Sequence, residues 1–400
     1  MVFSLRNIFT AAAVLSATAI AAPQGPGGQG GAQGGGQQGS GSVATTTSSW
    51  APTTSNWASA SASATSTTSA SAVQAVSTST ACNNSPDLCD RQYSNVTHMG
   101  AHDSAFLRDA STDNSISGNQ YFNATYALNA GLRLLQTQVH LLNGTLENCH
   151  TTCDLLDGGS LESWLSAIKD WMDENTDEVV TLLIVNSDDQ DVSDFGSVFE
   201  SSGIDEYGYT PDGSGWPTLG SMISANTRLV TFIASINSST TYSYLLPEFE
   251  YVFETAYDVR SLSGFNCSID RPTTYDSASA AISDGLLPLM NHFAYSAIGS
   301  VEIPNVSDID TTNSPDTNTT GALGTHAYQC YNEWAQAPTF VLVDFYSEGP
   351  AIDTADNING ITATGRSDSS DSSSVAANPR GLGVKTGALV AFFAAAVLLV

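Results

Sequence analysis

The sequence has few basic side chains. It contains 11 Lys+Arg against 40 Asp+Glu, which gives a formal net charge of −29. A chain this acidic repels the phosphates of nucleic acids and of anionic lipids, so binding to either by charge is excluded. No Gly-rich phosphate loop of the G-x-G-x-x-G or Walker type follows a strand-like apolar run. That lack disfavours a nucleotide-binding open sheet.

The N-terminus has the three parts of a secretory signal. Arg6 provides the positive charge, residues 8–20 are apolar, and Ala19-Ile20-Ala21 is a small-residue cleavage site. We therefore expect a signal peptide over residues 1–21. Residues 22–80 are Gly/Gln-rich and then Ser/Thr/Ala-rich. This composition cannot build a core and is typical of a disordered, O-glycosylated stalk.

The C-terminus carries a second processing signal. Residues 362–378 form a linker rich in serine and other small residues, and residues 379–400 combine a polar spacer with a short apolar tail. This order predicts a glycosylphosphatidylinositol (GPI) anchor signal, and the tail is too short for a comfortable transmembrane helix. We expect a cell-surface protein, anchored to the membrane or transferred to the wall. The candidate attachment residues are Ser373, Ser374 and Asn378.

The cysteines all lie in the middle of the chain, as Cys82, Cys89, Cys149, Cys153, Cys267 and Cys330. An even number in a secreted chain indicates disulfides. Closeness in sequence favours Cys82–Cys89 and Cys149–Cys153, which leaves Cys267–Cys330. A zinc site is the alternative, but the C-x3-C spacing has no C-x2-C partner, so we predict no metal.

Eight N-glycosylation sequons fall in the same region, and each one that is used implies an exposed loop. They begin at Asn83, Asn95, Asn123, Asn143, Asn237, Asn266, Asn305 and Asn318. The sequon at Asn95 lies closest to the histidine motif described below.

Residues 81–361 have the pattern of a single α/β domain. Apolar runs such as Val179–Val185 and Thr339–Phe345 are apolar on both faces, as buried parallel strands are. Helical patterns lie between the runs, and the clearest covers Ser160–Asn175 with Ser160 as its N-cap. Alternation over this length predicts a TIM-type (β/α) barrel. An open doubly wound sheet is the alternative. We expect a monomer.

The most informative stretch is Thr97–Ser104, which reads THMGAHDS. A His beside an Asp at the end of a strand is where an α/β barrel places its chemistry. His102 can act as a general base near neutral pH. A second histidine, His150, stands between two cysteines. Two histidines on successive loops suit phosphodiester cleavage, in which one accepts a proton and the other donates one. The alternative is that both are ordinary polar loop residues.

Several predicted strands run into polar residues. Val185 precedes Asn186, Met290 precedes Asn291, and Val343 precedes Asp344. In a barrel these ends share one face with the histidine loops. Asp344 is a lone carboxylate in an apolar run, where burial is costly without a partner. We expect it to orient and charge His102, and the alternative is a hydrogen bond to loop amides.

Together these residues resemble the X-type catalytic barrel of the phosphatidylinositol-specific phospholipase C superfamily, and within it the fungal secreted PLC-like phosphodiesterases. Gly100–Ser104 (GAHDS) resembles the loop that holds the family's base. Gly131–Gln138 (GLRLLQTQ) resembles its second strand, and His150 follows that strand where the family has its general acid. The runs VVTLLIVNSDD and FVLVDFY resemble later strands. The resemblance covers roughly residues 95–350.

The resemblance implies a two-histidine reaction without metal or cofactor. His102 would deprotonate an inositol hydroxyl, His150 would protonate the leaving alkoxide, and Asp103 and Asp344 would support His102. The products would be a cyclic phosphodiester and a diacylglycerol-like alcohol. We also expect Gln136, Gln138, Asn186 and Asn291 to bind substrate.

This chain departs from the family at the strand-two positions. Bacterial members have an Arg where this chain has Gln138, and animal members have acidic calcium ligands at the positions of Gln136 and Gln138. A neutral amide cannot neutralise a phosphorane, and such a loss typically costs several kcal/mol. Arg133 lies at odd parity to both glutamines and should face away. Loop residues that could substitute are Arg91, Arg108, Arg260 and Arg271.

Three functions therefore remain open. The first is a metal-independent phosphodiesterase acting on an inositol phospholipid, a GPI anchor or a related cell-surface phosphodiester. The second is a non-catalytic cell-surface or wall protein that keeps the barrel as a scaffold. The third is a glycoside hydrolase, which would use a carboxylate pair such as Glu254 and Asp344 and would leave the histidines without a role.

Overall fold

The computed structural model describes residues 81–298 and 301–367. The predicted signal peptide, stalk, anchor residues and C-terminal signal lie outside these residues and stay predictions. No helix in the described part of the chain is both long and apolar enough to span a bilayer.

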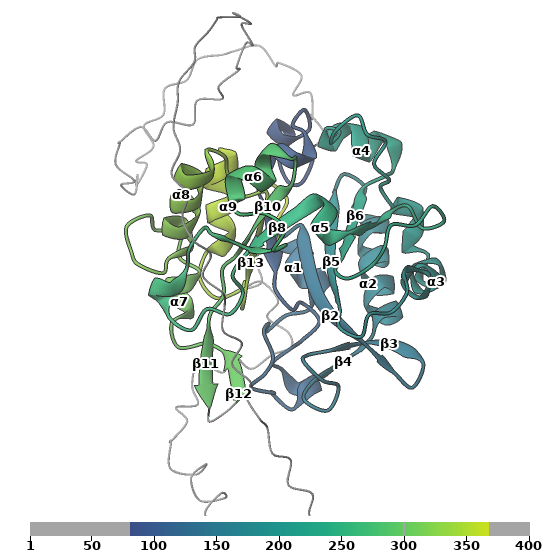
Figure 1. Ribbon diagram of the computed structural model, residues 1–400, viewed down its shortest axis with the longest axis horizontal. Coiled ribbons are helices and arrows are strands. Elements are labelled where there is room, and N and C mark those ends of the chain that lie inside the picture. Colours follow the sequence, from purple (N-terminus) through teal and green to yellow (C-terminus); the bar gives the residue numbers. More distant parts are fainter. Residues whose placement is uncertain (1–80, 299–300, 368–400) are drawn as a thin grey trace, which may run out of the picture. The chain divides into compact units, whose positions relative to one another are not determined.

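The fold is built on one curled, mainly parallel sheet (Figure 1). Its parallel strands lie in the order β7-β6-β5-β2-β1-β13-β10-β8, and this arrangement confirms the predicted barrel class. Their bounds are β1 His98–Ala101, β2 Leu134–Leu142, β5 Val180–Asn186, β6 Leu229–Ile233, β7 Leu245–Pro247, β8 Val252–Thr255, β10 Leu287–Asn291 and β13 Phe340–Val343.

Strand pairing does not close the barrel. Within the described residues no backbone ladder joins β7 to β8, so the sheet ends at β7 on one side and at β9 (Ile269–Arg271) on the other. Strand β9 runs antiparallel to β8. Strands β3 (Thr145–Cys149) and β4 (Asp157–Ser160) extend β2, and β11 (Tyr295–Ile298) pairs with β12 (Val301–Pro304). Both hairpins project at the end where the parallel strands finish (Figure 1).

Helices follow the strands and cover the outer face of the sheet. The α-helices are α1 Ala124–Asn129, α2 Leu161–Glu174, α3 Val192–Ser202, α4 Leu219–Ala225, α5 Glu248–Tyr251, α6 Ala278–Ser283, α7 Ile309–Thr312, α8 Leu323–Trp334 and α9 Ala351–Asn359. Short 3-10 turns occur at Pro86–Leu88, Tyr93–Asn95, Ala110–Thr112, Ile204–Tyr207 and Leu262–Gly264. Helix α2 begins as predicted, because the Ser160 hydroxyl accepts from the Ser163 N–H.

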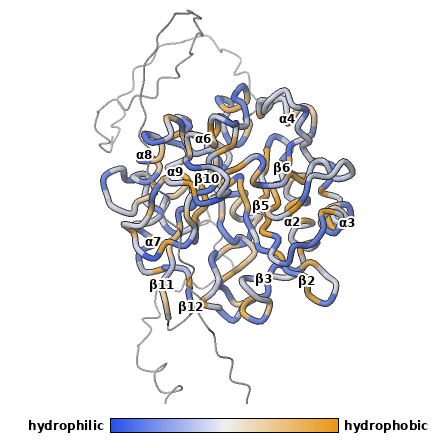
Figure 2. Tube along the Cα trace, in the orientation of Figure 1, coloured by the Kyte–Doolittle hydropathy of each residue, from blue (hydrophilic) through white to orange (hydrophobic). Residues whose placement is uncertain are grey.

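The strands are apolar on both faces because each face meets a separate core. Leu134 belongs to the cluster inside the barrel, and its neighbour Leu135 belongs to the cluster beneath the helices. Figure 2 shows the hydrophobic residues concentrated along strands such as β5 and β10. Gly100 is required on β1, because a Cβ there would lie 2.6 Å from the Leu134 side chain.

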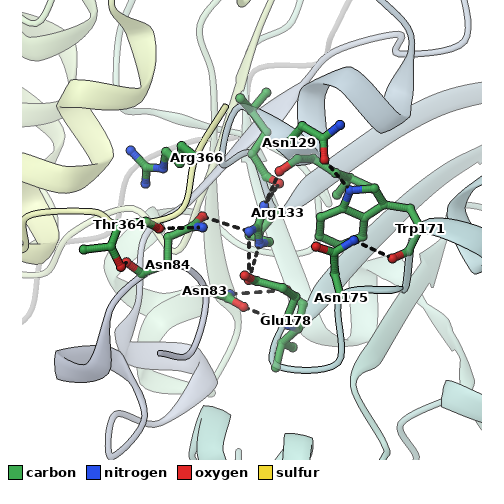
Figure 3. A network of polar contacts seen from close by, with 12 residues as sticks. Asn83, Asn84, Asn129, Arg133, Trp171, Asn175, Glu178, Thr364 and Arg366 are labelled. Carbon is green, nitrogen blue, oxygen red and sulfur yellow. Dashed lines mark hydrogen bonds and ion pairs between the residues drawn. The ribbon is translucent and has the colours of Figure 1, made fainter. Parts of the chain in front are cut away.

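Arg133 anchors the end of the barrel where the parallel strands begin (Figure 3). Its guanidinium is buried and contacts Glu178 at 2.8 Å and Asn84 Oδ1 at 2.8 Å. It also donates to the Leu128 carbonyl at 2.7 Å. The segment before β1 is thereby fixed to β2 and to the α2–β5 loop. Arg133 faces away from the candidate site, as its parity predicted.

The cysteines form the three disulfides that sequence proximity favoured: Cys82–Cys89, Cys149–Cys153 and Cys267–Cys330. Most sequon asparagines are exposed, and Asn305 is half-buried. Asn83 corrects one expectation, because its side chain is buried and its Nδ2 donates to the Val179 carbonyl at 3.2 Å. A glycan on Asn83 would have to replace that hydrogen bond.

Candidate active site

His102 and Asp344 meet because of the register between β1 and β13. Ala101 pairs with Val343, so the next residue on each strand enters the same space. The His102 Nδ1–H donates to Asp344 Oδ1 at 2.8 Å, and Asn119 Nδ2 donates to the same oxygen at 3.0 Å. Phe293 stacks on the imidazole with ring centroids 3.6 Å apart. These contacts hold the ring and leave Nε2 as the atom free for proton transfer.

His150 reaches the same space from the loop between β3 and β4. The disulfide Cys149–Cys153 closes this loop. His150 Nε2 lies 3.2 Å from Asp103 Oδ2, and His102 Nε2 lies 3.6 Å from that same oxygen. One carboxylate therefore stands between the two imidazoles. Asp103 was expected to support His102, and the structure places it closer to His150.

The backbone at each of these loops adopts a left-handed conformation. The φ angles are 49° at Asp103, 63° at Thr151 beside His150, and 44° at Phe345 beside Asp344. Such angles are uncommon for any residue other than glycine and are least favourable for β-branched or bulky side chains. Their occurrence at three loops around one point indicates that the surrounding structure imposes a local geometry there.

The charges in the site shift the pKa values of His102 and Asp103 in opposite directions. Burial alone would lower the pKa of His102, but the carboxylates of Asp103 and Asp344 outweigh it and raise that pKa above 6.5. Burial would raise the pKa of Asp103, but His102 and His150 lower it below 3.8. The arrangement therefore favours an ionised Asp103 and a strengthened base at His102.

The two glutamines on β2 shape the histidine loops. Gln136 Oε1 accepts from the Asp103 N–H at 2.6 Å. Gln138 Oε1 accepts from the Thr151 N–H at 3.1 Å, and its Nε2 lies 3.5 Å from Asp103 Oδ2. Both amides thus hold the backbone that carries the candidate acid and base.

The other two predicted binding residues also have protein partners. Asn186 accepts from the Gln190 N–H at 2.9 Å and donates to the Gln190 carbonyl at 2.9 Å, so it forms the turn after β5. Asn291 Nδ2 donates to the Thr255 carbonyl at 2.9 Å and lies 3.3 Å from Glu254 Oε2. The structure therefore gives both a structural role.

Glu254 belongs to a carboxylate cluster inside the barrel. It forms an ion pair with Arg271 and lies next to Glu248, which is also buried. Its charge also acts to raise the pKa of His102. Because Glu254 is paired with Arg271 and Asp344 with His102, neither carboxylate stands as the free partner that a glycoside hydrolase needs.

Most basic side chains in the described part of the chain are engaged away from the histidines. The ion pairs are Arg133–Glu178, Lys169–Asp173, Lys169–Glu206, Arg260–Asp258, Arg260–Glu302 and Arg366–Asp356. Arg91 donates to the Asn359 carbonyl at 2.7 Å. Arg108 is different, because it lies on the loop after β1 and its pKa responds to Asp344. Burial lowers that pKa, while Tyr121 and Asp344 act against the change.

Sequence reasoning missed the residues that hold the base in place. Gln120 Nε2 donates to the His102 carbonyl at 2.7 Å and to the Val343 carbonyl at 3.0 Å. Asn119 and Phe293 contact Asp344 and His102 as described above. Tyr295 packs edge-on against Phe293, with ring centroids 5.9 Å apart, and burial first and then Asp344 and Asp103 raise its pKa. These residues lie in loops or at a strand end without a repeating pattern, so only the three-dimensional contacts identify them.

The chain belongs to the PI-PLC X 1 family, whose model matches residues 88–359. It is 33% identical over 286 residues to a PI-PLC X domain-containing protein 1 of Arthroderma benhamiae, covering 70% of this chain and 90% of the relative. It is 34% identical over 298 residues to a protein of the same fungus named "Uncharacterized secreted protein". That match covers 71% of this chain and spans 65% of the relative's length.

Solved structures of phosphatidylinositol-specific phospholipase C are also similar. The Listeria monocytogenes enzyme has 15% identity and a TM-score of 0.44, with 69% of this chain and 96% of that chain covered. A Staphylococcus aureus structure has 12% identity and a TM-score of 0.46, with 70% and 97% covered.

Proposed function

We propose that this protein is a phosphodiesterase that cleaves by two-histidine general acid–base catalysis. The observation that carries the proposal is the shared Asp103 carboxylate, 3.6 Å from His102 Nε2 and 3.2 Å from His150 Nε2. This contact supports the proposed roles of the two histidines as proton-transfer groups, and the hydrogen bond from His102 to Asp344 supports His102 as the base. Family membership supports the same reaction class.

The reaction moves two protons. A hydroxyl of the substrate gives its proton to His102 Nε2 while its oxygen forms a bond to phosphorus. Asp344 stabilises the imidazolium that results. The bond from phosphorus to the leaving oxygen breaks, and that oxygen takes a proton from His150, which Asp103 orients. The products are a cyclic phosphodiester and an alcohol, and neither step requires a metal or cofactor.

The proposed substrate is an inositol phospholipid, a GPI anchor or a related phosphodiester at the cell surface. The N-terminal signal and the secreted relative support export, and the C-terminal signal supports attachment through a GPI anchor. A protein anchored in this way lies at the membrane and reaches membrane phosphodiesters without a basic surface. With a net charge of −29, this chain has no such surface.

Arg108 is the cation we assign to the developing charge on phosphorus. It lies on the same loop as Asp103, is half-buried, and interacts electrostatically with Asp344. In the structure its guanidinium donates to the Ser115 carbonyl at 3.2 Å and lies 5.2 Å from the Phe345 ring centroid. Its Nη2 also donates to the Ile116 carbonyl, so the proposed role requires the guanidinium to exchange these carbonyls for a bound phosphate.

The test uses the secreted chain, phosphatidylinositol vesicles and a GPI-anchored reporter, first in EDTA and then in calcium. We expect inositol cyclic phosphate in EDTA, and its loss in His102→Ala and in His150→Ala. His140→Ala is the matched control, because His140 pairs with Asp188 outside the site. Absence of product from the folded wild-type protein on every substrate would contradict the proposal.

A non-catalytic surface protein is the second candidate. One observation favours it. The β2 positions that carry an Arg or calcium ligands in other family members are Gln136 and Gln138 here, and their amides bind the backbone of the histidine loops. Among the described residues no Lys or Arg contacts Asp103 or either of the two histidines. Binding of inositol phosphate headgroups without turnover would favour this candidate.

A further inference from the structure

Two adjacent amide side chains, Asn119 and Gln120, are buried next to the candidate base. Each residue has 0% of its surface exposed, and both lie outside the named helices and strands, in the loop that follows β1. A buried amide is costly unless its polar atoms find partners, so the partners of this pair indicate what it holds. These partners include the backbone of His102 and the side chain of Asp344.

Gln120 links the ends of β1 and β13 beyond their final backbone hydrogen bond. That bond runs from the His102 N–H to the Val343 carbonyl at 3.0 Å. Gln120 Nε2 donates to the carbonyls of His102 and Val343 at 2.7 and 3.0 Å. Its Oε1 accepts from the Tyr346 N–H at 3.1 Å. Both hydrogens of the amide nitrogen are therefore used inside the protein and are not available to a substrate.

Asn119 holds Asp344 through its side chain and its backbone. Its Nδ2 donates to Asp344 Oδ1 at 3.0 Å, and the same oxygen accepts from His102 Nδ1 at 2.8 Å. Its backbone carbonyl accepts from the N–H of Phe345, the next residue after Asp344, at 2.9 Å. Phe345 has a φ of 44°, which is unfavourable for a bulky side chain. This hydrogen bond therefore helps to keep an uncommon backbone conformation beside the carboxylate.

The amide of Asn119 also acts on the charge of the imidazole. Its Nδ2 lies 3.4 Å from His102 Nδ1, so the positive end of the amide dipole is close to the ring. Its donation to Asp344 also takes up part of the negative charge that stabilises a protonated His102. The charged groups that act on this imidazole are Asp103 on its own loop, Asp344 after β13 and Glu254 on β8. All three are acidic, and Asn119 is a neutral donor that opposes them.

We propose that Asn119 and Gln120 are positioning residues that keep His102 Nε2 directed at the substrate and limit the strength of this base. Gln120 fixes the backbone that carries the imidazole. Asn119 fixes the carboxylate partner of the imidazole and opposes the acidic charges around it. Neither amide transfers a proton, so both act through His102. Their effect on turnover rests on the proposed function, whereas their effect on the titration of His102 does not.

The experiment measures the titration of His102 by NMR in the secreted chain with labelled histidine, together with the turnover of phosphatidylinositol. Asn119→Leu removes the donor and keeps a similar shape. We expect the pKa of His102 to rise, because the protonated ring loses a neighbouring positive dipole, and the acid limb of kcat/KM should move to higher pH with it. Loss of the Asp344 charge has the opposite sign. We expect kcat to fall at least about tenfold at little change in KM, because Asn119 acts through His102.

Gln120→Met tests the backbone contacts separately. Methionine has a similar length but no N–H, so the carbonyls of His102 and Val343 lose their side-chain donor. We expect kcat to fall at least about tenfold, because the imidazole is less well oriented. The acid limb should stay in place, since the hydrogen bonds of Gln120 go to the backbone and not to the ring.

Asn359→Leu is the matched control. Asn359 is also buried, and its amide accepts from the Thr97 N–H and donates to the Thr97 carbonyl, both at 2.9 Å, before β1 begins. This variant should lose stability as Asn119→Leu does, because a buried backbone contact is removed in both. It should leave kcat and the titration of His102 unchanged.

The titration separates this proposal from the proposed function. A folded Asn119→Leu protein in which His102 titrates as in the wild type would overturn the proposal, and so would an equal displacement in Asn359→Leu. If Asn119→Leu does not fold, Asn119→Ala is judged by the same two criteria. A wild type without turnover, in which Asn119→Leu still raises the pKa of His102, would refute the proposed reaction and support the hold of Asn119 on the imidazole.

Discussion

The Nδ1 atom of His102 lies 2.8 Å from Oδ1 of Asp344, although 242 residues separate them in the sequence. The adjacent strands β1 and β13 bring them together at their carboxyl ends. A second His–Asp pair in the chain, His140 and Asp188, has a contact of 3.0 Å but is partly exposed and lies outside the site. Substitutions at the two pairs can therefore separate what a His–Asp pair contributes inside the candidate site from what such a pair contributes elsewhere in the chain.

Replacing the buried carboxylate tests its role directly. We expect Asp344→Asn to lower the turnover of phosphatidylinositol by roughly 10³–10⁴-fold, because the neutral amide neither fixes the His102 tautomer nor stabilises its charged form. The assay is release of inositol cyclic phosphate under saturating substrate. Asp188→Asn should leave the rate within about twofold, since an exposed pair contributes little. Equal losses in both variants would refute the assignment.

The pH dependence of the rate follows from the raised pKa of His102. A general base works in its unprotonated form, so kcat/KM should rise with pH and level off above a pKa higher than 6.5. Asp344→Asn removes one of the three carboxylate charges that raise this pKa, the others being Asp103 and Glu254. The acid limb of the profile should therefore move to lower pH in that variant while the plateau falls. If the acid limb of the profile does not move, the pKa that it reports belongs to a group other than His102.

Stability should depend on pH through Glu248. Burial first, and then Glu254, raises the pKa of Glu248 well above 4.5. A carboxyl with a raised folded-state pKa stabilises the fold fully below its unfolded pKa, and that contribution is lost as pH rises through the folded value. Glu248→Gln removes this loss. The thermal midpoint of the variant, relative to that of the wild type, should therefore rise as pH increases from about 5 to about 8. A difference between the two midpoints that stays constant over this range would contradict the raised pKa of Glu248.

The Cys149–Cys153 disulfide should matter more for activity than for stability. Closing so short a loop restricts the unfolded chain little, so the double serine variant should lose about 2 kcal/mol. The same change at Cys267–Cys330, with a separation of 63 residues, should cost about 4 kcal/mol. Denaturant unfolding measures both. The Cys149 variant should nevertheless be the less active of the two, because this loop carries His150.

Arg133 should affect stability and not activity, because it lies far from the candidate active site. Arg133→Met leaves Glu178 without its cation in a largely buried place, which should cost roughly 3–5 kcal/mol. Lys169→Met breaks an exposed pair with Asp173 on α2 and should cost under about 1 kcal/mol. Neither substitution should change the KM of the folded enzyme. A large change in KM for Arg133→Met would link this end of the barrel to the site.

The barrel and the grouping of His102, Asp103, His150 and Asp344 could be predicted because local signals determine them. Apolar runs mark the buried strands, and a polar residue directly after such a run must lie at the strand end. Roles that depend on distant partners could not be predicted in the same way. The burial of Asn83 against Val179 and the pairing of Arg271 with Glu254 each join segments whose contact no spacing reveals.

The open barrel also affects how copies of the chain meet. An unclosed sheet has edge strands to which another strand could add. The two end strands of the main path, β7 and β9, each have three residues, and a proline stands at or directly after the end of each: β7 ends in Pro247, and Pro272 follows β9. Proline has no N–H to donate, and so short a ladder gains little from a neighbour. Such edges disfavour the joining of two copies sheet to sheet while the barrel stays open.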